Sequence, residues 1–96
     1  MSFEEFSASL TGHSPAEPIP AYLKALWYDA KQDWEKAHNI AQDLHDSTGS
    51  WIHAYLHRKE GDVGNAGYWY RKAGRPMPAY SLDREWEEMV KELLVV

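Results

Sequence analysis

The chain has 96 residues, which fits one domain with its own core, and 44% of them are hydrophobic, so the chain is not disordered by composition. Its net charge of −5 argues against non-specific nucleic-acid binding, and the absence of cysteine excludes disulfides, thiol catalysis and cysteine-based zinc sites. Residues 1–10 lack the features of a signal peptide, and no segment approaches the roughly 18 apolar residues that span a bilayer. We therefore expect a cytoplasmic protein that binds neither nucleic acid nor membranes.

A short helix is the first expected element, within residues 1–20. Apolar side chains recur at helical spacing over residues 2–10, and Ser2 can cap this helix together with Glu5 three positions later. A glycine and three prolines follow, so residues 11–20 are expected to form an extended connection.

Residues 21–46 predict a first helical hairpin. Pro20 can stand at the start of its first helix, where a missing N–H group costs nothing, and Asp33 has the character of an N-cap for the second helix. The stretch Asp-Ser-Thr-Gly at 46–49 has the composition of a turn and is expected to end that helix.

Residues 49–74 predict a second hairpin. Thr48 or Ser50 is expected to cap its first helix, Gly61 to end that helix, and Asp62 to cap the next one. A proline-rich link follows, and an apolar stripe then predicts a C-terminal helix over residues 81–95. The sequence lacks a sustained alternating pattern, so we predict a single all-α domain over residues 1–96.

The two predicted hairpins repeat at an offset of 29 residues. At this offset Tyr22 falls on Trp51, Asp33 on Asp62 and Ala37 falls on Ala66. Few of the aligned positions are identical, but aromatic, small, capping and apolar positions recur in the same order. The simplest interpretation is two tandem helical hairpins.

The second hairpin resembles the tetratricopeptide and Sel1-like repeat families. Its small, aromatic and proline positions follow the tetratricopeptide spacing, and residues 62–73 are similar to the closing half of a Sel1-like repeat; the matching positions are Ala54, Ala66, Tyr70, Ala73 and Pro78. Most of the chain also resembles small bacterial proteins of unknown function. The repeat resemblance implies a scaffold that binds a peptide or protein partner in a groove lined by the first helix of each hairpin.

Transferred residue by residue, that resemblance assigns the groove to Trp51, Tyr55 and Arg58, with Tyr22 and Leu26 as weaker counterparts. Arg71 belongs to the basic region of the chain and could add a contact to an acidic peptide. The alternative is a solvated face with intramolecular ion pairs. Two hairpins make a very short solenoid, which the terminal helices could cap or a homodimer could complete.

His53 and His57 are four residues apart and share one helix face, a spacing that can chelate a metal ion. The residues between them provide no glutamate for a zinc-protease motif, and His38, His45 or Glu60 could each be a third ligand. Packing at the hairpin interface is the favoured interpretation of both histidines. We therefore expect a non-enzymatic protein–protein interaction module without cofactors, and the alternative is a small metal- or ligand-binding protein.

Overall fold

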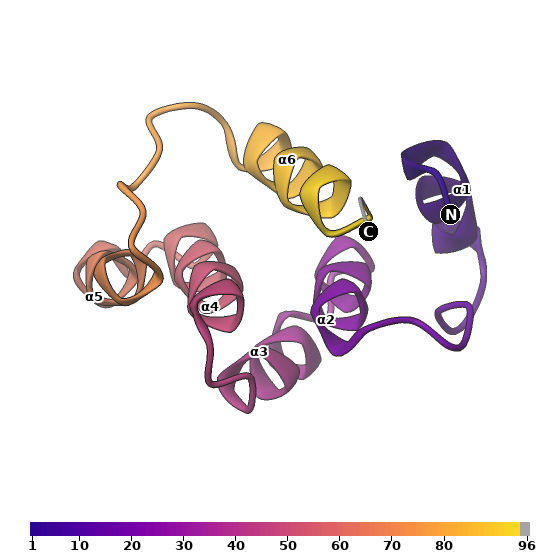
Figure 1. Cartoon of the computed structure of the whole chain (residues 1–96), viewed down its shortest axis with the longest axis horizontal. Helices are drawn as coiled ribbons and strands as arrows, with labels where there is room; N and C mark the ends of the chain where they lie inside the picture. Colours follow the sequence, from indigo (N-terminus) through magenta and orange to yellow (C-terminus); the bar gives the residue numbers. More distant parts are fainter. Residues whose placement is uncertain (95–96) are drawn as a thin grey trace.

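The computed structural model describes residues 1–94, and every regular element in this range is a helix (Figure 1). The elements are α1 (Phe3–Ala8), the 3-10 turn η1 (Ser9–Thr11), α2 (Ala21–Ala30), α3 (Trp34–Gln42), α4 (Ser47–Lys59), α5 (Val63–Ala73) and α6 (Leu82–Leu94). The all-α prediction is confirmed for these residues; residue 95, expected in the last helix, lies outside them. None of the described helices has both the length and the apolar character needed to cross a membrane.

Helix α4 lies at the centre of the molecule. It contacts α3 and α5, its neighbours in the sequence, and also α2 and α6. Figure 1 shows α3 and α6 on opposite sides of α2 and α4. Every residue of α4 from Gly49 to His57 is buried, including two histidines and a serine, because partner helices surround it. The central helix is therefore where polar side chains must find partners inside the protein.

The turns that join α2 to α3 and α4 to α5 have the same geometry. Asp33 and Asp62 cap the following helices as predicted, each accepting a backbone N–H three residues later. The residues before them, Gln32 and Gly61, both have positive φ, at 66° and 89°. Ala37, 29 positions before its counterpart Ala66, is fully buried, and so is Ala66. The two turns therefore share a positive-φ residue, a capping aspartate and a buried alanine four residues later.

The start of α4 differs from the prediction. Asp46 caps this helix by accepting the N–H of Gly49 at 2.8 Å, so neither Thr48 nor Ser50 is the cap. Residues 47–49 form the first helical turn because a β-carbon is absent at Gly49. A β-carbon there would lie 2.1 Å from the carbonyl oxygen of Leu44. The glycine is needed for a close backbone approach and does not mark a turn.

The N-terminal helix and α6 pack against each other through aromatic rings. Ser2 and Glu5 form the predicted capping box of α1. Phe3 and Phe6 each lie with their ring centroids 6.0 Å from Trp86 of α6. This aromatic contact therefore joins the two terminal helices of the described chain.

Candidate metal centre

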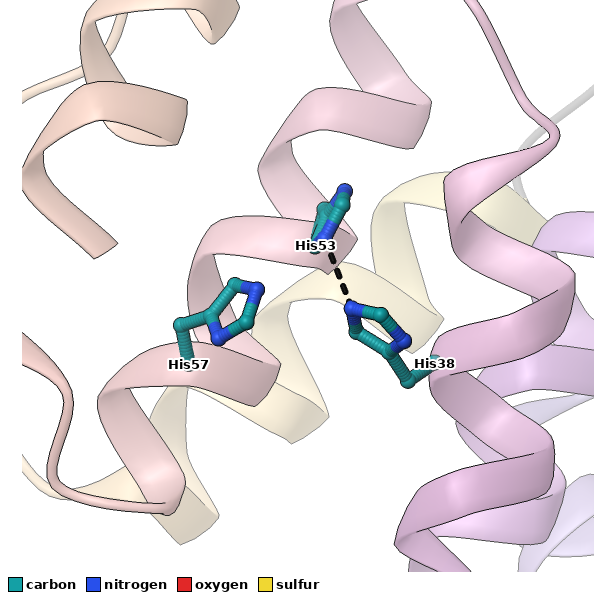
Figure 2. A group of neighbouring side chains, drawn as sticks. All are labelled: His38, His53 and His57. Atoms are coloured by element: carbon teal, nitrogen blue, oxygen red, sulfur yellow. Dashed lines mark hydrogen bonds between the residues drawn. The ribbon is translucent and has the colours of Figure 1, made fainter. Parts of the chain in front are cut away.

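Three histidines from two helices converge between α3 and α4. His53 and His57 lie one turn apart on α4, and His38 faces them from α3 (Figure 2). The ring centroids are 4.6 Å apart for His38 and His53, 5.1 Å for His38 and His57, and 4.8 Å for His53 and His57. The three rings thus form a nearly equilateral group that links the first helix pair to the second.

Two tryptophans hold this group from outside. The Trp34 ring stacks on His38 with a centroid distance of 4.8 Å, and its indole N–H donates to the Leu56 carbonyl at 2.8 Å. The Trp69 ring stacks on His53 at 4.0 Å. These contacts fix two of the imidazole planes and shield them from water. His53 and His57 are only 6% and 7% exposed, and His38 is half-buried.

Hydrogen bonds direct ring nitrogens towards the centre of the group. The Nε2 atoms of His38 and His53 lie 2.9 Å apart, so one of these atoms donates a proton to the other. His57 Nδ1 lies 2.6 Å from Glu60 Oε1, and a carboxylate accepts at this distance. When a neutral His57 carries its proton on Nδ1, its lone pair is on Nε2. Asn65 Nδ2, 3.4 Å from this Nε2, also faces it as a donor.

In metal sites a carboxylate often accepts a hydrogen bond from the outer nitrogen of a ligand histidine, since this bond fixes the tautomer that presents a lone pair to the ion. Glu60 occupies that position behind His57. Glu60 and Asp62 could also approach an ion together with His57. Both carboxylates are exposed, and Asp62 already caps α5, so capping and the His57 hydrogen bond account for them.

Burial favours the neutral forms of His38 and His53. Burial lowers the pKa of His53 to about 4, and the neighbouring His38 and His57 add to this effect. Burial also lowers the pKa of His38, with a further contribution from His57. Neutral imidazole is the form that binds metals, and an ion bound through both Nε2 atoms would displace the proton that His38 and His53 share.

The spacing of the three side chains suits a tetrahedral ion. One ring nitrogen from each histidine lies within 4.8 Å of the other two. Zinc–nitrogen bonds of about 2.1 Å place two tetrahedral nitrogen ligands about 3.4 Å apart, so small side-chain rotations bring this group into range. Three neutral imidazoles suit zinc, copper, nickel or cobalt better than magnesium or calcium, which prefer oxygen ligands.

The metal-free protein is expected to lose stability as the pH falls through the window between 6.5 and 4. The unfolded His53 side chain takes up its proton near pH 6.5, whereas the folded one does so near 4. The free energy of unfolding is therefore highest above pH 6.5 and decreases by up to about 3 kcal/mol towards pH 4. Chemical denaturation in a chelator across this range measures it.

His53→Gln is the matched variant for this measurement, because glutamine retains a hydrogen-bonding group but does not titrate. The stability difference between wild type and variant should narrow as the pH falls. Parallel pH profiles would show that His53 is not held neutral by the fold.

The structure corrects the predicted binding groove. Trp51, Tyr55 and Leu26 are 3%, 2% and 0% exposed, so they are core residues and cannot line an open groove. Helix α6 covers this side of α4. Arg58 is also engaged, since it pairs with Glu85 of α6 at 2.8 Å and donates to the Tyr80 carbonyl.

Glu85 is the centre of the contact that covers the predicted groove. It is fully buried and accepts hydrogen bonds from Arg58, from the Tyr70 hydroxyl at 2.7 Å and from the Trp51 indole at 3.1 Å. Glu85 lies on the buried side of α6, three residues after Leu82 and four before the buried Met89, and this helical spacing marks that side in the sequence.

The remaining predicted contact residues lie apart from one another. Tyr22 is half-buried on α2, and its hydroxyl donates to Asp46. Arg71 is exposed on α5 and forms no ion pair with the residues that the structure describes. The six predicted contact residues, five for the groove and Arg71 for the basic region, are therefore divided between core, helix contacts and an outer surface.

Of the three candidates for a third ligand, the structure selects His38. His45 lies beyond the end of α3 and is exposed, and Glu60 binds the outer nitrogen of His57.

Comparisons with protein-family models, curated proteins and solved structures find no match for this chain. The geometry of the histidine group therefore carries the functional argument.

Proposed function

We propose that this protein binds a divalent transition-metal ion, with zinc as the reference ion, through His38, His53 and His57. The observation that carries the proposal is the convergence of three shielded imidazoles from two helices (Figure 2). A purely structural role needs only packing and satisfied hydrogen bonds. A metal site needs in addition three ring nitrogens within reach of one ion, and this group has them within 4.8 Å of one another.

A bound ion would connect parts of the fold that are separate in the sequence. His38 belongs to the pair α2–α3, and His53 and His57 belong to the pair α4–α5. Coordination would cross-link these pairs at the α3–α4 contact. Because the unfolded chain does not hold three imidazoles in this arrangement, the binding free energy would stabilise the folded state.

Zinc is expected to raise the melting temperature of protein that carries no polyhistidine tag. Free zinc at about one hundred times its Kd stabilises a native state by about 2.7 kcal/mol. His38→Ala removes one ligand from α3 and should abolish most of this increase. Differential scanning calorimetry with and without zinc, after chelator treatment, measures the effect.

His45→Ala is the matched control, because His45 is exposed and lies outside the group. It should retain the wild-type response to zinc. No zinc response in the wild type, or equal responses in wild type and His38→Ala, would contradict the proposal.

A second proposal is a protein–protein contact of the kind that the tetratricopeptide and Sel1-like resemblance implies, relocated to the outer face of α5. Tyr68 is 48% exposed and Val63 is 61% exposed on this helix, and Arg71 is exposed without an ion pair among residues 1–94. Aromatic and arginine side chains are frequent at interface hot spots. The positive charge of Arg71 fits an acidic segment of a partner protein.

Arg71→Glu is expected to weaken capture of such a partner without affecting folding, because the side chain lies outside the core. Affinity purification at low and high salt should show a salt-sensitive partner for the wild type that the variant loses. A partner set that is unchanged by Arg71→Glu would remove α5 as the contact surface.

A further inference from the structure

A cavity of about 210 Å³ adjoins the histidine group. It lies between the end of α3, the start of α4 and α5, and His53 forms part of its wall. Two other cavities lie within residues 1–94, and neither is lined by His38, His53 or His57. This cavity is therefore the space from which a small molecule could approach an ion held by the group.

Lys72 and Asp46 are the basic and acidic side chains that line this cavity. Lys72 lines it, with Nζ 5.3 Å from the centroid of the Trp69 ring, and it forms no ion pair with any described residue. Asp46 also lines the cavity, but its carboxylate accepts the Tyr22 hydroxyl and the Gly49 N–H. The charges of Lys72 and Asp46 offset each other, so a bound divalent ion would make the site positive and favour a negatively charged ligand.

The other walls favour an organic anion over an inorganic one. Trp69 and Leu44 supply apolar surface, and Ser50 supplies a hydroxyl to the same lining. A carbon chain can pack on the apolar surface while a carboxylate pairs with the lysine. Sulfate or phosphate could use only the polar part of this lining.

The protein supplies three ligand atoms to the ion. No fourth side-chain ligand lies within 4.8 Å of all three histidine nitrogens in the described part of the chain. A zinc site with three protein ligands leaves its fourth position to water or to an exogenous ligand. A carboxylate oxygen is a suitable ligand for that position.

We infer that the metal-loaded protein binds a small carboxylate in the cavity beside His53, with Lys72 pairing with the anion and the ion accepting an oxygen ligand. This inference rests on the proposed metal site. The ion and Lys72 together recognise the charged group, and Trp69 with Leu44 contacts the carbon chain. The protein would then be a receptor for a metal-coordinating organic acid.

Cobalt-loaded protein provides the test, because the visible absorption of cobalt(II) reports its ligands. Titration with acetate and succinate should change the spectrum in a saturable manner, whereas sulfate at equal ionic strength should not. Lys72→Met should weaken carboxylate binding about tenfold, which corresponds to the loss of one charge-assisted contact. Lys36→Met is the matched control. Lys36 belongs to α3, lies over the Tyr28 ring of α2 and does not line the cavity.

The possible outcomes separate the two proposals. If His38→Ala and wild type both fail to give a cobalt spectrum, the metal site and this inference are overturned together. If wild type binds cobalt but no carboxylate changes its spectrum, the metal site stands and only this inference is overturned. Equal responses to sulfate and carboxylates, or an unchanged affinity in a Lys72→Met variant with wild-type cobalt binding, would also overturn it.

Discussion

Replacing Glu85 with alanine is expected to destabilise the protein by about 3–5 kcal/mol, the range found when one partner of a buried ion pair is removed. Glu85 is fully buried and satisfies Arg58, Tyr70 and Trp51 at once. Its loss leaves a cation and two polar groups without their acceptor beneath α6. Urea denaturation followed by tryptophan fluorescence measures the free energy of unfolding.

The matched control for Glu85→Ala lies two residues away on the same helix. Glu87 forms an exposed ion pair with Lys91, and exposed pairs contribute about 0–1 kcal/mol. Glu87→Ala should therefore have little effect. Similar losses for the two variants would show that α6 is not anchored through Glu85.

Replacing Gly49 with alanine is the second change with a large expected effect. The new β-carbon would lie 2.1 Å from the Leu44 carbonyl oxygen and 2.5 Å from its β-carbon. Because the nearest atom belongs to the backbone, the chain entering α4 must move. We expect a loss of about 3 kcal/mol or more, at the upper end of overpacking effects. Thermal unfolding measures this loss.

Gly64→Ala serves as the comparison, because it places the same methyl group on a helix with no atom within 4 Å. It should leave stability unchanged or raise it by up to about 1 kcal/mol, as alanine favours helix more than glycine does. A small effect of Gly49→Ala would mean that the α3–α4 connection can shift freely.

Local signals predicted the helices well. Capping aspartates such as Asp33 and Asp62 act through hydrogen bonds to residues three positions away, so sequence spacing determines them. Apolar spacing similarly predicted the N-terminal helix and the C-terminal helix. The error at the start of α4 arose because the stretch 46–49 has turn composition, whereas its glycine serves a contact with Leu44 that only the folded chain creates.

The candidate site required tertiary information. His53 and His57 were predictable from their spacing, but the choice of His38 depended on where α3 ends. Positions 34, 38, 41 and 45 share one face of a continuous helix. Because α3 ends at Gln42, His45 leaves that face and His38 remains on it. Local patterns did not predict this end.

The groove was misplaced for a different reason. Trp51, Tyr55 and Arg58 do share one face of α4, as their spacing predicts. The sequence pattern does not specify which element covers that face, and α6 returns across a link of about eight residues to bury it. Glu85 provides the polar contacts that make this burial favourable.

The position of α4 has a consequence for cooperativity. Helices from the first pair, the second pair and the C-terminus all contact it, so its buried side chains serve several interfaces at once. In an extended array of repeats each unit contacts only its neighbours, and units can unfold in succession. Here no pair of helices has a core of its own. Unfolding of residues 1–94 should therefore occur in one transition, and cleavage between α3 and α4 would leave two fragments that do not fold separately.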